Sequence, residues 1–199
     1  MKFTPRSEST RQFIIETCAP VFNQKGFAGT SITDLEKVTK LSKGSIYGNF
    51  ENKDAVAIAV FEYNLENKLG LIRRWEDRAA TLKGKLLAHI HIHYPNAETL
   101  FTAGGCPIQN TAIEADDTHE ILREKAAAGL IRWQKGMEKL IQEGISAGEF
   151  YMDTNPSETA LHIISLIEGA AMTAKLTKDM SLAVTLLAIA EKTVEAISK

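Results

Sequence analysis

The sequence has few of the features that mark secreted or membrane proteins. Its two cysteines, Cys18 and Cys106, are too few for a disulfide framework, which favours a reducing compartment. The polar start of the chain, MKFTPRSEST, contains no apolar stretch of the kind found in signal peptides. The longest apolar-leaning stretch, residues 160–172, is interrupted by polar side chains and is too short to span a bilayer. We therefore expect a soluble, cytoplasmic protein with no membrane partner.

An excess of positive charge is also absent. Lysine and arginine number 23 against 25 aspartates and glutamates, so the net charge is −2. This balance excludes proteins that bind nucleic acid through bulk positive charge, such as basic tails. It does not exclude a small DNA-reading module beside an acidic domain. Residues 1–55 carry eight basic and six acidic residues, which agrees with such a module without establishing it.

The signals of β-structure are scarce too, because polar and apolar residues rarely alternate. Apolar residues instead recur at helical spacing, as in Ile14, Cys18, Val21 and Phe22, which form a buried stripe. We therefore predict an all-α protein. In its second half, helices are expected over residues 80–101, 107–115, 118–146, 157–177 and 180–197. Pro95 should kink or break the first of these.

Two short helices are predicted near the N-terminus. Thr30 or Ser31 caps the first, and Ser42 caps the second, expected over about residues 43–50. Two short helices joined by a tight turn, the second starting with small and basic residues, are typical of a helix-turn-helix. Lys and Asn side chains reach bases or phosphates, and Tyr commonly donates to phosphate. On periodicity alone, an ordinary short helix in a bundle stays open.

Four ordered segments make this interpretation specific: FNQKGF at 22–27, TSITDL at 30–35, SKGSIY at 42–47 and FENKDA at 50–55. Together they resemble the N-terminal domain of the TetR family of transcriptional regulators. The resemblance implies an all-helical homodimer with a helix-turn-helix DNA-binding domain over 1–52 and a ligand-binding and dimerisation domain over 53–199. It also implies that an inducer bound to the C-terminal domain releases the DNA.

The resemblance implies DNA contacts at Thr30, Thr33, Ser42, Lys43, Ser45, Tyr47 and Lys53, and the helix pattern adds Gly44 and Asn49. Three positions depart from the family pattern. Lys40 stands where glycine is common in the turn, so left-handed backbone there would cost strain. Glu36 stands where alanine is usual and is expected to face solvent. The pair Gly48 and Asn49 replaces residues that are often aromatic or histidine.

The second half offers candidates for an enclosed, largely apolar ligand pocket. They are His89, His93, Phe101, Cys106, Ile108, Trp133, Met137 and Met172. His89 and His93 also have a spacing usable for a metal, but a pocket-lining or structural role is favoured, so we expect no metal and no cofactor. Cys106, in a Gly-Gly-Cys-Pro turn, is either a reactive thiol that senses oxidants or electrophiles or an inert packing residue.

No catalytic pattern stands out, because phosphate-cradling loops, nucleophile elbows and Cys-x-x-Cys motifs are all missing. The acidic group Glu114, Asp116 and Asp117 is expected to be a solvated helix end. We predict a ligand-responsive regulator rather than an enzyme, and favour a repressor. Its partners would be a palindromic operator in double-stranded DNA, a second copy of itself and a small-molecule effector. A helical enzyme or carrier, and an activator of the same family, are the alternatives.

Overall fold

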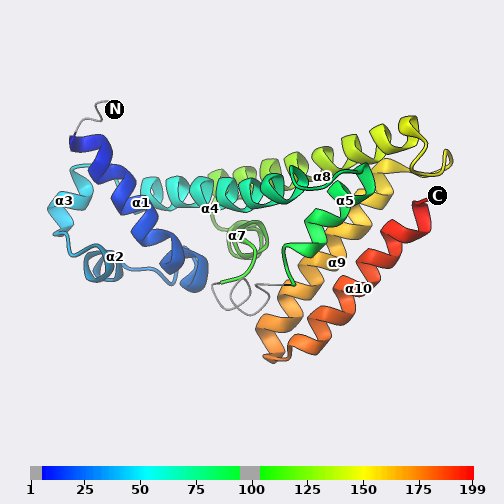
Figure 1. Cartoon of the computed structure of the whole chain (residues 1–199). Helices are drawn as coiled ribbons and strands as arrows, with labels where there is room; N and C mark the ends of the chain where they lie inside the picture. Colours follow the sequence, from blue (N-terminus) through cyan, green and yellow to red (C-terminus); the bar gives the residue numbers. More distant parts are fainter. Residues whose placement is uncertain (1–5, 95–103) are drawn as a thin grey trace. The chain divides into compact units, whose positions relative to one another are not determined.

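The computed structural model describes residues 6–94 and 104–199 (Figure 1). Within these ranges it consists of helices and turns with no β-strand, and the all-α prediction is confirmed. The helices are α1 (Arg6–Lys25), α2 (Ile32–Thr39), α3 (Lys43–Tyr47), α4 (Lys53–Glu76), α5 (Leu82–His91), α7 (Pro107–Ala115), α8 (Glu120–Ala147), α9 (Pro156–Thr177) and α10 (Met180–Ile197). Among these helices, none combines the length and apolar character that a membrane span requires.

Packing divides the chain into two compact units. The N-terminal unit comprises residues 1–67 and 107–127, and the C-terminal unit comprises residues 68–106 and 128–199. The N-terminal unit therefore takes in α1, α2, α3 and α7 together with the first parts of α4 and α8. The functional boundary expected after residue 52 stays a prediction, since packing and function need not divide a chain at the same residue.

The core of the N-terminal unit forms where α1 packs on the two short helices. Ile14 and Cys18 of α1, Leu35 of α2 and Ile46 of α3 are all completely buried. Burial raises the pKa of the Cys18 thiol to about 11, so this cysteine is an inert part of the core. Pro20 lies inside α1, as the sequence indicated, and the helix continues past it to Lys25.

The C-terminal unit is built around the helix pair α9 and α10. These two helices pack against each other, and both bury small side chains that allow a close approach. The small residues are Ala170 and Ala174 on α9 and Ala183 and Ala190 on α10. Asn155 caps α9 and Pro156 occupies its first position, where the missing N–H of proline costs no hydrogen bond. The sequence therefore fixes both the start of α9 and the small residues that it buries.

Two predicted helices are too long. The helix expected over residues 80–101 ends at His91 and is followed by a turn through Tyr94. A proline disfavours helical backbone at the residue before it, so a helix that ends before Tyr94 agrees with the expected effect of Pro95. Likewise α3 ends at Tyr47, because Gly48 caps it, rather than near residue 50. The other four expected helices match α7 to α10 within about two residues at each end.

Candidate functional site

Reciprocal hydrogen bonds start α2 of the helix-turn-helix. The Ser31 hydroxyl accepts from the backbone N–H of Asp34, and the Asp34 carboxylate accepts from the N–H of Ser31 at 2.9 Å. The Lys25 ammonium also binds this carboxylate. The hydrogen bonds from Lys25 and Ser31 hold the pKa of Asp34 well below its usual range. Asp34 therefore stays ionised at the start of α2, where a negative charge favours the helix.

Two hydrogen bonds cap the start of α3, the second helix of the helix-turn-helix. The Ser42 hydroxyl accepts from the N–H of Ser45 at 3.2 Å, as its position predicted. The N–H of Lys43 donates to the Glu36 carboxylate at 2.7 Å. Glu36 was expected simply to face solvent, and this was wrong, because its carboxylate binds a helix N–H that would otherwise lack a partner. A sequence gives no sign of this contact, since its two residues belong to different helices.

Seven of the nine residues assigned to DNA lie on α2 or on and beside α3, and all seven are exposed or half-buried. Thr33, Ser42, Lys43 and Gly44 are exposed, and Ser45, Tyr47 and Asn49 are half-buried. The Lys43 ammonium lies 5.8 Å from the centre of the Tyr47 ring, so these two side chains share a face.

Thr30, in the loop before α2, and Lys53, the first residue of α4, stabilise that loop instead. The Thr30 side chain is fully buried and donates to the carbonyl of Gly26 at 2.6 Å. The Lys53 ammonium donates to the carbonyls of Phe27 and Thr30, at 2.8 and 3.1 Å.

The turn between α2 and α3 contains the strained residue that the sequence indicated. Lys40 ends α2 in the left-handed conformation, with φ of 59°, and its N–H donates to the carbonyl of Glu36. Left-handed backbone costs a non-glycine residue about 1–2 kcal/mol, so the turn keeps its shape at the expense of stability.

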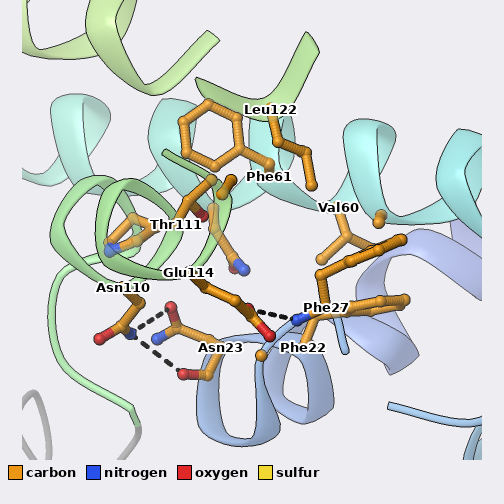
Figure 2. A pocket seen from close by; sticks show the side chains of 14 residues that line it. Phe22, Asn23, Phe27, Val60, Phe61, Asn110, Thr111, Glu114 and Leu122 are labelled. Carbon is orange, nitrogen blue, oxygen red and sulfur yellow. Dashed lines mark hydrogen bonds between the residues drawn. The ribbon is translucent and has the colours of Figure 1, made fainter. Parts of the chain in front are cut away.

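The loop over residues 26–30 is also contacted by α7. The N–H groups of Phe27 and Ala28 donate to the two oxygens of Glu114, at 2.6 and 2.8 Å. Figure 2 shows the hydrogen bond between Phe27 and Glu114. Both residues line a small pocket of about 30 Å³, which has room for about two water molecules. The expectation of a solvated acidic helix end is thus wrong for Glu114, while Asp116 and Asp117 are exposed.

A chain of buried polar contacts runs through the C-terminal unit. The Trp133 indole N–H donates to Nδ1 of His89 at 2.8 Å, so the ring proton of neutral His89 lies on Nε2. That nitrogen lies 2.8 Å from the Glu76 carboxylate, and its hydrogen bond lowers the pKa of Glu76. His89 and Trp133 stand out in the sequence as candidates for the ligand pocket, whereas Glu76 belongs to no local motif and could not be predicted.

Lys68 joins this chain through the face of Trp133. Its ammonium lies 3.8 Å from the indole centre, 2.9 Å from the Cys106 sulfur and 3.0 Å from the Glu168 carboxylate. Burial acts to lower the pKa of Lys68, but its contacts with Cys106 and Glu168 outweigh burial and raise that pKa. The C-terminal unit therefore encloses a charged ammonium, with only 10% of its side chain exposed.

The other residues assigned to the ligand pocket are distributed unevenly. His93, Cys106 and Met137 are buried in the C-terminal unit, whereas Ile108 is buried in the N-terminal unit. Met172 is half exposed on α9.

Two of these assignments stay predictions for different reasons. Phe101 lies outside the described residues. For Cys106 both interpretations, reactive sensor and inert packing residue, stay open. No group of three or more His, Cys, Asp or Glu side chains in residues 6–94 and 104–199 is arranged to hold a metal ion.

Two family models match the chain. The model described as bacterial regulatory proteins, tetR family, matches residues 14–60, and the model described as tetracyclin repressor-like, C-terminal domain, matches residues 83–189.

Solved structures and curated proteins agree with these matches. A TetR-family regulator from Cytophaga hutchinsonii is 44% identical, covers 99% of this chain and 98% of its own, and has a TM-score of 0.94. A TetR regulator from Chloroflexus aurantiacus is 31% identical over 98% of both chains, with a TM-score of 0.91. The transcriptional repressor DhaR from a Mycobacterium species is 26% identical over 85% of this chain and 84% of its own.

Proposed function

Because this chain belongs to the TetR family of helix-turn-helix transcriptional regulators, we propose that it represses transcription by binding a palindromic operator as a homodimer. The family resemblance read from the sequence is confirmed. The effector that releases the operator is a small molecule bound by the C-terminal unit.

One observation carries the DNA-binding part of this proposal: Lys43 and Tyr47 share the accessible face of a short helix that is capped at its start. A cation and a phenol side by side can both bind phosphate, and the exposed Gly44 lets the helix approach the major groove closely. Thr33 and Ser42 are also exposed and offer hydroxyl groups. Direct DNA contact by Thr30 is not part of the proposal, because its side chain is buried.

Exposed apolar residues on α9 and α10 support the homodimer. They are Leu161, Met172, Leu176, Leu182, Val184 and Ile189, and Leu176 is 80% exposed. Several large apolar side chains exposed on one helix pair indicate a protein interface. Two copies joined through these helices would present two recognition helices to half-sites about 34–36 Å apart, or a multiple of that distance.

The polar chain around Trp133, His89 and Lys68 is the proposed ligand-binding region, because it offers an aromatic face, a neutral imidazole and a fixed charge inside the C-terminal unit. Small-molecule sites combine an apolar enclosure with a few such polar groups. An effector that favours a conformation unsuited to the operator shifts the population away from DNA, and couplings of about 1–3 kcal/mol are typical.

Selection of genomic DNA fragments by the purified protein tests the proposal. We expect enrichment of an inverted repeat, protected from cleavage over two half-sites, and a dimer in sedimentation. Failure to enrich any inverted repeat, or turnover of a small substrate instead, would support a helical enzyme or carrier. A reporter placed behind the recovered operator separates the two signs of regulation: higher expression without the protein indicates a repressor, and lower expression an activator.

A further inference from the structure

The loop that leads from α1 into α2 contains a small anion site filled by the chain itself. The N–H groups of Phe27 and Ala28 are consecutive and both point at Glu114 of α7, one carboxylate oxygen each. Successive backbone N–H groups aimed at one point form a concave site for an anion. Two charge-assisted hydrogen bonds of this length rank among the stronger contacts that a loop can make.

Gly26 makes this contact possible. Its φ of +76° is left-handed, which suits glycine, and its N–H donates to the carbonyl of Phe22 at 2.9 Å to end α1. A Cβ on Gly26 would lie 2.4 Å from one oxygen of Glu114, far closer than atoms can approach. Glycine is therefore required both for the backbone conformation and for the space that the carboxylate occupies.

A second side chain of α7 binds the same end of α1. Asn110, one turn before Glu114, donates to the backbone carbonyl of Asn23 at 3.1 Å and lies 3.2 Å from the side-chain oxygen of that residue. Figure 2 shows Asn110 and Glu114 side by side on α7, both pointing towards the end of α1. Residues four apart on a helix share a face, so together the two contacts hold α7 against the last turn of α1 and the loop that follows it.

The carbonyl groups of the loop are bound from α4. Lys53 donates to the carbonyls of Phe27 and Thr30, and its ammonium lies 4.2 Å from the Phe27 ring centre. The ring of His119 meets the same phenylalanine edge-on, with the centroids 5.0 Å apart. Phe27 is thus held by a carboxylate at its N–H and by an ammonium at its carbonyl, four residues before Ser31 starts α2.

We infer that Glu114 is a positioning residue for operator recognition, which fixes the loop into α2 and thereby the orientation of the helix-turn-helix. The inference rests on the proposed operator binding. The inference predicts a change in DNA affinity opposite to the change that charge repulsion alone would produce. A carboxylate in a unit that binds DNA repels phosphates, so removing its charge alone should strengthen binding. If Glu114 acts through the loop, removing its charge should weaken specific binding instead.

The variants Glu114→Gln and Asp117→Asn separate these two effects. Each replaces one carboxylate of the same region by its amide, but Asp117 is exposed and Glu114 binds the loop. A glutamine retains one acceptor oxygen and turns an NH2 group towards the other loop N–H. Affinities are measured for the full-length protein on the recovered operator and on a scrambled duplex of equal length.

For Glu114→Gln we expect about a tenfold loss of operator affinity with no loss on scrambled DNA, and for Asp117→Asn an unchanged or slightly higher affinity for both. Gly26→Ala displaces the Glu114 carboxylate without removing its charge and should reproduce the loss. Amide hydrogen exchange at Phe27 and Ala28, measured on the free protein, should accelerate at least tenfold in Glu114→Gln and stay unchanged in Asp117→Asn.

Operator specificity in Glu114→Gln equal to that of Asp117→Asn would overturn the inference while leaving the proposed function intact. Unchanged exchange at Phe27 and Ala28 in a folded Glu114→Gln protein would overturn it as well. A wild-type protein that prefers no DNA sequence would reject the proposed function, and the inference with it. If Glu114→Gln does not fold, Glu114→Asp, which keeps the charge but shortens the side chain, decides by the same two measurements.

Discussion

The two units use charged side chains in opposite ways. In the N-terminal unit the charges near the helix-turn-helix lie at the surface, and its caps join residues three apart, as in Ser31 with Asp34 and Ser42 with Ser45. In the C-terminal unit a lysine is enclosed, and its carboxylate partner Glu168 lies 100 residues away in the chain. A DNA-reading surface needs charges that water and phosphate can reach, whereas a regulatory core must compensate every charge that it buries.

This contrast predicts where a lost ion pair matters for folding. Lys68→Met leaves Glu168 buried without its ammonium, and we expect the free energy of unfolding to fall by about 3–5 kcal/mol. Lys25→Met breaks the pair with Asp34, where half of the lysine side chain is exposed, and should cost less than about 1 kcal/mol. Denaturant unfolding of both variants measures the difference.

The double variant Lys68→Met with Glu168→Leu is the control for this pair, because it removes both buried charges and should recover most of the lost stability. Equal losses for Lys68→Met and Lys25→Met would contradict the contrast between the units.

The same contrast explains what the sequence could predict. The helix-turn-helix was predictable because caps, turn and apolar stripe are all local signals, as Ser42 with its cap three residues on illustrates. The polar chain of the C-terminal unit was only half predictable. His89 and Trp133 stand out by residue type, but Glu76, Lys68 and Glu168 become partners only when distant helices pack.

Glu36 and Glu114 show the same limit within the N-terminal unit. Both look like surface carboxylates in the sequence, and both bind backbone N–H groups of another element. Hydrogen bonds that a side chain accepts from a distant backbone leave no periodic pattern, because the position of the donating N–H depends on the path of the backbone and not on its residue types. Gly26 is the only local indication of the loop geometry near Glu114, because a glycine directly after a helix often ends it in the left-handed conformation.

Substitutions on α3 should affect DNA binding more than folding. We expect Lys43→Ala and Tyr47→Ala each to lower operator affinity about tenfold. The free energy of unfolding should stay unchanged within about 0.5 kcal/mol in Lys43→Ala, whereas Tyr47 packs against the core and its truncation should cost about 1 kcal/mol. In Lys43→Ala, the loss of one phosphate contact should also reduce the slope of log affinity against log salt concentration by about one. Lys135→Ala, which removes an exposed lysine of α8, is the matched control and should leave binding unchanged. Unaltered affinity in both α3 variants would remove the assigned DNA surface.

Acid should destabilise the protein through the C-terminal unit. Burial, together with the charge of Lys68, lowers the pKa of His93 from 6.5 to about 3. Between these values the unfolded chain binds a proton at His93 and the folded chain does not, so stability falls as the pH falls. One such proton costs up to about 1.4 kcal/mol for each pH unit below 6.5.

Unfolding measured between pH 6.5 and 5 tests this prediction, because most carboxylates stay ionised there. We expect His93→Gln to flatten the dependence and His162→Gln, which alters an exposed histidine of α9, to leave it as in the wild type. The result that would count against the assignment is a His93→Gln protein that retains the full acid sensitivity.

The smallest expected effects come from a backbone geometry that the two units share. Lys40 and Lys178 each end a helix in the left-handed conformation, with φ of 59°, and donate their N–H to the carbonyl four residues back. Glycine removes the left-handed strain but makes the unfolded chain more flexible, so each Lys→Gly variant should gain about 0.5–1 kcal/mol of stability.

The two variants should differ in operator binding. Lys178→Gly should leave operator affinity unchanged, whereas Lys40→Gly removes a cation from the helix-turn-helix and should lower operator affinity a few-fold at low salt. Lys40→Arg keeps charge and strain and should match the wild type in both measurements. A loss of stability in either glycine variant would mean that the lysine side chain contributes more than its backbone conformation costs.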